Sequence, residues 1–165
     1  MLKPPLVEAI VVEAIKGAIA AASPSVPCVV SGFWQPSLAG SIKRGESPDT
    51  VAFVNVATSL GNQPTFSDPN VTLTVAVTLA VRCERDAQSN ALPAIAAAID
   101  ALFRDWQRRT YQDTFTDLDV DGLSIDELGI NAGDPTVNFA AKVATIPWRL
   151  SLSGVFNPEN PQPTT

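Results

Sequence analysis

The sequence contains no histidine. Histidine is the commonest general base in enzymes, activates the nucleophile of catalytic triads and is a frequent zinc ligand. Phosphate-binding P-loops and glycine-rich dinucleotide motifs are absent as well. The acids fall in turns and polar positions rather than among apolar neighbours that would separate the pKa values of a carboxylate pair. We therefore expect a protein that is not an enzyme and uses no cofactor.

Cysteine and charge are also scarce. Cys28 and Cys83 lie too far apart in the chain for CxxC redox chemistry or a thiolate metal cluster. They suit two buried small hydrophobic residues, and the sequence leaves a disulfide open. Charged residues make up 17% of the chain, against roughly 25% in an average soluble domain. This deficit indicates either a surface covered by other copies or partners, or a large core beneath a Ser/Thr-rich exterior.

No segment suits a membrane span. The longest apolar stretch, residues 6–22, is short for a bilayer and contains Glu8, Glu13 and Lys16. The two glutamates also argue against a signal peptide. The net charge of −6 argues against a nucleic-acid backbone as the main ligand. We expect a protein that is made and used without secretion.

Hydrophobic periodicity predicts two helices and a set of strands. Apolar residues recur at helical spacing over residues 5–22 and again over about 92–108. In residues 71–84 apolar side chains alternate strictly with Thr and Ala, which predicts a long strand with one core face and one small-residue face that a neighbour could approach closely. The other predicted strands cover residues 26–35, 50–59, 115–130 and 139–156, the last being a strand pair or one long strand interrupted at Pro147. A turn is expected at residues 61–64.

These elements give the order α-β-β-β-α-β-β. The order predicts an α+β fold, a mostly antiparallel β-sheet with two amphipathic helices packed on one face. Residues 1–156 form a single domain, and the proline-rich residues 157–165 form a flexible tail. Trp106 lies on the helical stripe and is expected in the core, whereas Trp34 and Trp148 suit either core or interface.

One acidic pattern resembles the opening of a calcium loop. Asp117, Asp119 and Asp121 alternate and are followed by glycine, as in D-x-D-x-D-G. The twelfth position, which should hold a bidentate glutamate, is Leu128, and Glu127 is one residue short. A solvated acidic strand with its polar side outward explains the same spacing. Calcium is therefore only a weak candidate ligand.

The wider region is uniformly negative, because every charged residue between positions 113 and 134 is acidic. Such a surface serves solubility, repels DNA or docks a basic partner. The candidate interface or lumen residues are Asp113, Asp117, Asp119, Asp121, Asp126 and Glu127.

Four segments resemble the tail-terminator (tail-completion or minor tail) proteins of long-tailed bacteriophages. They are the helix LVEAIVVEAIKGAIAA, the strand VTLTVAVTLAVRCE, the helix LPAIAAAIDALFRDWQ and the closing strand IPWRLSLSGVF. The resemblance spans residues 5–156 and rests on architecture, because this family has no catalytic motif.

The resemblance implies a virion structural protein of the tail or neck, assembled in the host cytoplasm. It implies a homohexameric ring that caps the tail tube protein, ends tube polymerisation and meets the head–tail connector. DNA would pass only as cargo, and no membrane is involved. Residues 113–127 would then line an acidic bore, and the loop at residues 36–49 would dock to the tube.

Two alternatives remain open. The first is another phage neck, connector or tail-tube protein; a tube protein polymerises alone, whereas a terminator stops at one ring. The second is a non-viral binding module with a calcium-stabilised loop.

Overall fold

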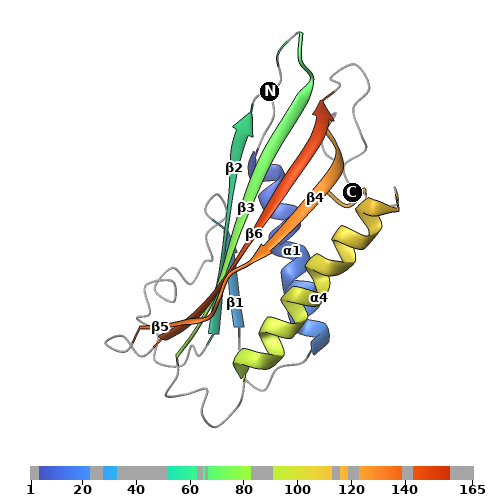
Figure 1. Ribbon diagram of the computed structural model, residues 1–165. Helices are drawn as coiled ribbons and strands as arrows, with labels where there is room; N and C mark the ends of the chain where they lie inside the picture. The colour runs from blue at the N-terminus through green and yellow to red at the C-terminus, as the bar shows by residue number, and fades with distance from the viewer. Residues whose placement is uncertain are drawn as a thin grey trace.

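The computed structural model describes residues 4–22, 28–32, 52–62, 65, 67–82, 91–112, 116–118, 123–138 and 143–156. Its elements in chain order are α1 (Pro4–Ala22), β1 (Cys28–Gly32), β2 (Ala52–Asn62), β3 (Asn70–Arg82), α4 (Ala91–Tyr111), β4 (Leu123–Ala132), β5 (Thr136–Asn138) and β6 (Val143–Phe156). The predicted order is confirmed, with the short β5 added before the last long strand (Figure 1).

The strands form one six-stranded sheet in the order β1-β2-β3-β6-β4, with β5 also paired to β6. All pairs are antiparallel except β1 with β2. The prediction of a mostly antiparallel sheet is therefore confirmed. β6 pairs with three strands: β3 accompanies it along one side, while β4 and then β5 occupy the other.

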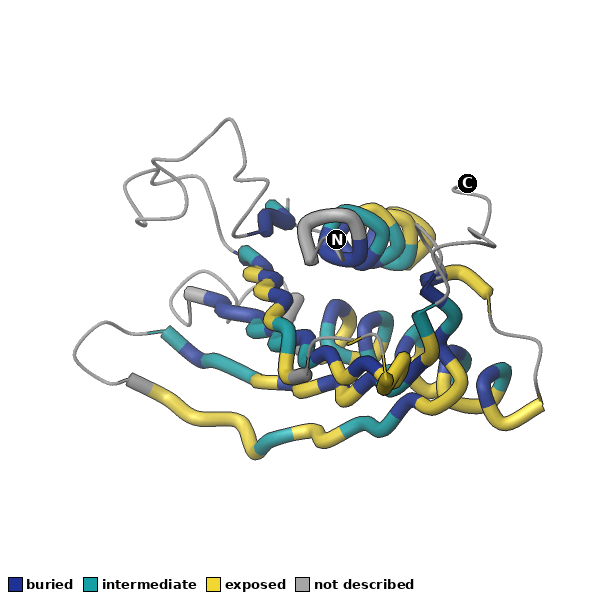
Figure 2. The backbone as a smooth tube through the Cα atoms, turned by 90° about the horizontal axis from the view of Figure 1, so that it is seen from above, coloured by how far each residue is buried: buried dark blue, intermediate teal, exposed yellow. Residues whose placement is uncertain are grey.

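Both helices cover the same face of the sheet (Figure 1). α1 lies against β1 and β2, α4 lies against β4, and the helices contact each other. The alternating strand supplies the centre of this core, since each apolar residue from Val71 to Val81 on its helix-facing side is at most 1% exposed. Figure 2 shows buried and exposed residues alternating along the strands. Full burial of each such side chain contributes roughly 1.5–3 kcal/mol.

Aromatic residues join the helices to the sheet. Trp106 on α4 is 1% exposed, and Trp148 on β6 is 3% exposed. Phe103 contacts both rings, with centroid distances of 5.7 Å to Trp106 and 6.3 Å to Trp148. The core placement of Trp106 is confirmed, and of the two alternatives for Trp148 the core is the correct one.

Two sequence boundaries were wrong. The strand expected from Phe115 begins only at Leu123, because residues 117–118 form a turn whose Leu118 is fully buried. The turn expected at residue 61 does not begin there, since β2 continues to Asn62 with an irregularity in its pairing to β3. Tertiary pairing with a long neighbouring strand outweighs the local turn preference of glycine and asparagine.

The last element is one continuous strand that runs through Pro147. The Pro147 carbonyl accepts a hydrogen bond from the Gly133 N–H at 2.8 Å. Because the N and O of a strand residue point to the same side, the missing proline N–H falls on the side where β4 ends and β5 begins. A proline at this gap in the pairing removes no ladder bond, which explains why the strand tolerates it.

The loop at residues 36–49, the tail at 157–165, Trp34 and Cys83 lie outside the described residues. In the part of the chain that is described, neither helix has the length and apolar character needed to cross a bilayer.

Candidate assembly surface

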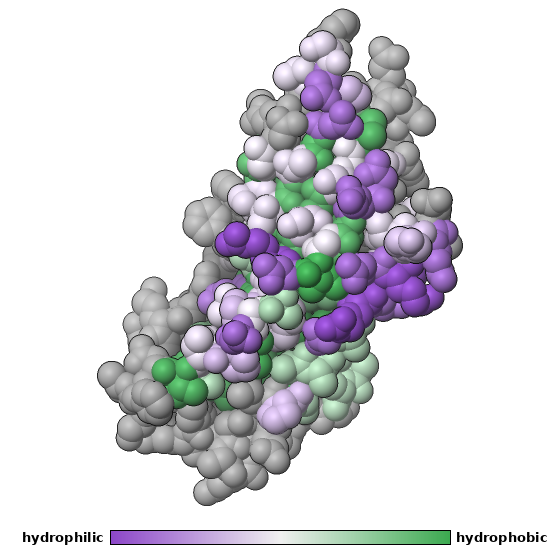
Figure 3. Space-filling view, viewed as in Figure 1, coloured by the Kyte–Doolittle hydropathy of each residue, from purple (hydrophilic) through white to green (hydrophobic). Residues whose placement is uncertain are grey.

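The sheet face opposite the helices carries small, weakly polar side chains. On β3 it presents Thr72, Thr74, Ala76 and Thr78, of which Thr72 is exposed and the others are half-buried. The cross-strand register places Ser153 and Ser151 of β6 beside the first two. In Figure 3 this open face is pale, whereas strongly hydrophilic side chains gather over α4 at the right. No helix of the described chain covers this open face.

Charge on the open face is confined to two places among the described side chains. One is Arg149 on β6, which is exposed and lies between Ala76 of β3 and Asn131 of β4 in the register. The other is the exposed pair Asp126 and Glu127 on the edge strand β4. The rest of this face is neutral, which matches the low charge content of the sequence.

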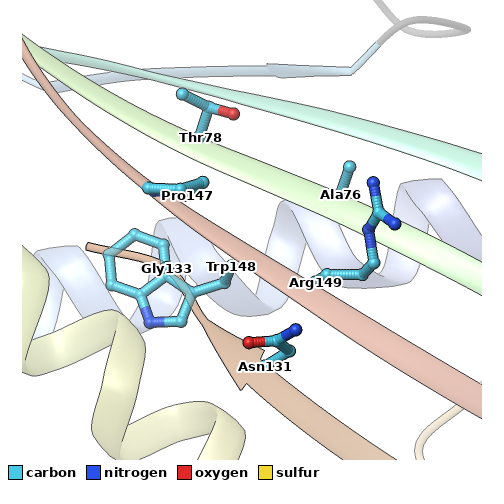
Figure 4. A pocket seen from close by; sticks show the side chains of 7 residues that line it. All are labelled: Ala76, Thr78, Asn131, Gly133, Pro147, Trp148 and Arg149. Atoms are coloured by element: carbon cyan, nitrogen blue, oxygen red, sulfur yellow. The ribbon is translucent and has the colours of Figure 1, made fainter. Parts of the chain in front are cut away.

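A hollow of about 340 Å³ lies beside Arg149 on the open face. Figure 4 shows its lining from three strands of the sheet and the turn after β4. The lining residues are Ala76, Thr78, Asn131, Gly133, Pro147, Trp148 and Arg149. The hollow forms where the pairing of β6 changes from β4 to β5, because the surface is recessed between the ends of these two strands.

Glycine is required at one edge of this hollow. A Cβ added to Gly133 would lie 2.5 Å from Cγ of Pro147. The small residue therefore allows the turn after β4 to approach β6 and donate its N–H to Pro147. The geometry of the hollow depends on this close approach.

Asp117 is held by an ion pair rather than left free for a cation. Arg109 of α4 donates from Nη2 to Oδ2 of Asp117 at 2.7 Å and from Nη1 to Oδ1 at 3.3 Å. Its Nε also bonds Oδ2 of Asp105 at 3.0 Å. The hydrogen bond to Asp117 raises the pKa of Arg109, which favours the charged form of the guanidinium. The reading of residues 117–121 as a solvated strand is wrong at Asp117, which lies in a turn.

The predicted acidic residues separate into distinct groups. Asp126 and Glu127 lie together at a β-bulge, where β4 has one more residue than β6 between Ile125 and Glu127. Asp113, Asp119 and Asp121 lie outside the described residues. Within the described ranges, no three Asp, Glu, Cys or His side chains group as metal ligands.

Two further groups, one buried and one half-buried, belong to the fold. Glu8 of α1 is fully buried against Gly32 of β1, and a Cβ added to Gly32 would lie 2.7 Å from Cδ of Glu8. Cys28 carries a free thiol, and burial raises its pKa to about 12. A thiol with so little thiolate at neutral pH is a poor nucleophile, which argues for a packing role.

Sequence reasoning missed the two arginines that organise this surface. Neither Arg149 nor Arg109 is among the candidate site residues that the sequence indicates. The i, i+4 spacing identifies a helical pair, but no local signal places Arg109 against Asp117 or keeps Arg149 apart from the described acids.

No protein-family model matches the chain, and no curated protein matches it. Among solved structures, the chain is similar to the mycobacterial sensor histidine kinase MprB at 12% sequence identity. That alignment covers 90% of this chain and 96% of that chain, with a TM-score of 0.27. At this TM-score the similarity carries no argument about fold or function.

Proposed function

We propose that this chain is a structural subunit of a bacteriophage virion, in which copies assemble into a closed ring. The ring caps the tail tube, ends its polymerisation and joins the tube to the head-side connector. The sequence resemblance to tail-terminator proteins supplies the specific role. The chain acts by binding other proteins and not by catalysis.

The open sheet face is the observation that carries the proposal. A face of Ser, Thr, Ala and Gly side chains loses little side-chain entropy on contact and requires few charges to be desolvated. It therefore suits a protein neighbour better than it suits a substrate. The low overall charge agrees with a surface that is covered in the assembly.

The negative net charge of the chain is compatible with DNA passing through the ring. With a net charge of −6, the subunit offers little attraction to phosphate. Acids facing a bore would repel the DNA and let it slide. The candidate bore residues include Asp119 and Asp121. Changing both to asparagine should leave assembly intact and alter genome retention or ejection; failure of the ring itself would contradict a bore role.

Size-exclusion chromatography with mass measurement, followed by negative-stain imaging, tests the ring. We expect one species of fixed copy number and a ring-shaped particle that does not grow with concentration. Open-ended tubes would instead identify a tube protein, and a monomer at every concentration would contradict the proposal. The resemblance predicts six copies.

A second test addresses the end of tube growth. Adding the assembled chain to polymerising tail tube protein should shorten the tubes and leave one ring at a tube end. Tubes of unchanged length with no ring at either end would favour the alternative role in the neck.

A further inference from the structure

Arg149 is exceptional among the arginines whose side chains are described, because no carboxylate of the described residues pairs with it. The others lie on α4, and each is paired with an aspartate of that helix. These pairs are Arg104–Asp100, Arg108–Asp105 and Arg109–Asp105. The cross-strand neighbours of Arg149 are the neutral Ala76 and Asn131. Its guanidinium therefore offers donors that described residues do not engage.

The hollow beside Arg149 is lined by both polar donors and apolar side chains. Arg149, Asn131 and Thr78 contribute donors around it, while Ala76 and Pro147 supply apolar walls (Figure 4). Guanidinium binds carboxylate through two parallel hydrogen bonds, and amide and hydroxyl groups can bond the remaining lone pairs. A second hollow with arginines in its lining, on α4, differs because its Arg104 and Arg108 are already paired with aspartates.

The chain carries a matching acidic patch at a separate place. Asp126 and Glu127 are exposed at the β4 bulge, and no described residue forms an ion pair with either. Bulges reorient side chains at sheet edges. Glu127 is level with Ser153, four residues along β6 from Arg149, or about 13 Å along the strand. The two patches of one copy are therefore too far apart to pair directly.

We propose that the hollow beside Arg149 receives the Asp126–Glu127 pair of a second copy of this chain. Because the two complementary patches lie at different places on one subunit, the contact is heterologous. A heterologous contact closes into a ring when the rotation that relates neighbouring copies is a whole-number fraction of a full turn. This inference rests on the proposed ring, and it names the residues that join neighbouring subunits.

Charge reversal tests the contact by chromatography with mass measurement and negative-stain imaging. Arg149→Glu should raise the protein concentration at which the ring forms by about tenfold to a hundredfold. The double variant Asp126→Lys/Glu127→Lys should have the same effect. Combining all three changes in one chain restores complementarity and should restore the ring. Arg104→Glu, which breaks an exposed pair within α4, is the matched control and should assemble normally.

Mixing the two defective variants provides an independent test. In the mixture, the reversed hollow can receive the reversed bulge, and the native hollow can receive the native bulge. We expect rings in which the two variants alternate. Such rings need an even copy number, and the expected hexamer has one. Circular dichroism melts show whether each variant is folded, and Arg149→Gln removes the charge without introducing an acid in case the reversal affects folding.

The outcomes separate this inference from the proposed function. If the wild-type chain forms a ring and both Arg149→Glu and Arg149→Gln form it equally well, the proposed contact is wrong and the proposed ring stands. Asp134 is another exposed acid, between β4 and β5. Rescue of Arg149→Glu by Asp134→Lys, and not by changes at Asp126 and Glu127, overturns the choice of acidic partner. A wild-type chain that forms no ring overturns the proposed function itself.

Discussion

At the scale of single residues, two buried threonines differ in hydrogen bonding. The hydroxyl of Thr110 on α4 donates to the Trp106 carbonyl at 2.8 Å. The buried Oγ1 of Thr58 on β2 has no hydrogen-bond partner in the described part of the chain. Both side chains are at least 92% buried, since their exposed fractions are 8% and 7%. A buried hydroxyl without a partner is destabilising, because it loses its bonds to water.

We predict that Thr58→Val stabilises the protein by about 1 kcal/mol, because valine has the same shape without the hydroxyl. The matched change Thr110→Val should cost about 0.5–1 kcal/mol through the lost hydrogen bond. Urea denaturation monitored by circular dichroism measures both. A loss of stability in Thr58→Val equal to that of Thr110→Val would show that Thr58 is hydrogen-bonded in solution.

At the scale of elements, α1 and β1 are joined by a close contact between a carboxylate and a glycine. Gly32 leaves room for the fully buried Glu8, and any larger residue there would press on the Glu8 side chain. Gly17 is different: it lies on an exposed turn of α1, and a Cβ added there would meet nothing within 4 Å. The two glycines therefore form a matched pair for substitution.

Gly32→Ala should destabilise the protein by about 1–3 kcal/mol, because an overpacked buried site must shift to admit a methyl group. Gly17→Ala should stabilise it by about 0.5–1 kcal/mol, because alanine has the higher helix propensity. Thermal melts of both variants, compared with the wild type, measure these two changes in stability. If Gly32→Ala melted above the wild type, Glu8 would have to be free to move away from β1.

The second link between elements is the ion pair that ties the turn at Asp117 to α4. The two side chains are 26% and 44% exposed, for Arg109 and Asp117 respectively, so solvent screens the pair. Asp105 shares Arg109, and a hydrogen bond from Arg108 is the largest cause that lowers the pKa of Asp105. The stability that ionised Asp105 contributes is therefore present above the ordinary pKa of aspartate, and it is lost as the pH falls through the lowered pKa of Asp105.

We predict that Asp117→Asn lowers the free energy of unfolding by up to about 1 kcal/mol, whereas the unpaired Asp126→Asn changes it little. A double-mutant cycle with Arg109→Gln isolates the pair. The melting temperature should not change with calcium or a chelator, since Arg109 neutralises the first residue of the calcium-like pattern. A clear rise with calcium would restore the calcium-loop interpretation.

At the scale of the whole molecule, the sheet has a rigid centre and weaker margins. β3 and β6 pair along their whole lengths and are both flanked by other strands. Among the described residues, β1 pairs on one side only, and β5 spans just three residues. Local opening is easiest where strands have few partners and hardest where opening requires global unfolding.

Hydrogen exchange should therefore be slowest in β3 and β6 and faster, by about two orders of magnitude or more, in β1 and β5. Mass spectrometry of peptic peptides measures these rates, and the same peptides from unfolded protein give the unprotected reference. Exchange in β6 as fast as in β5 would mean that the sheet opens as separate hairpins. Ring assembly should slow exchange further around the Arg149 hollow and the β4 bulge.

The sequence by itself determined the kinds of elements, their order and the buried side of each. Strict alternation from Val71 identified β3, and helical stripes identified α1 and α4, because these periods are local properties of the chain. Only the tertiary structure decided that β6 pairs with three strands, that Arg109 reaches Asp117 and that Arg149 pairs with no described acid. These facts depend on register between segments distant in sequence, which is set by packing and pairing across the whole sheet and not by any local pattern.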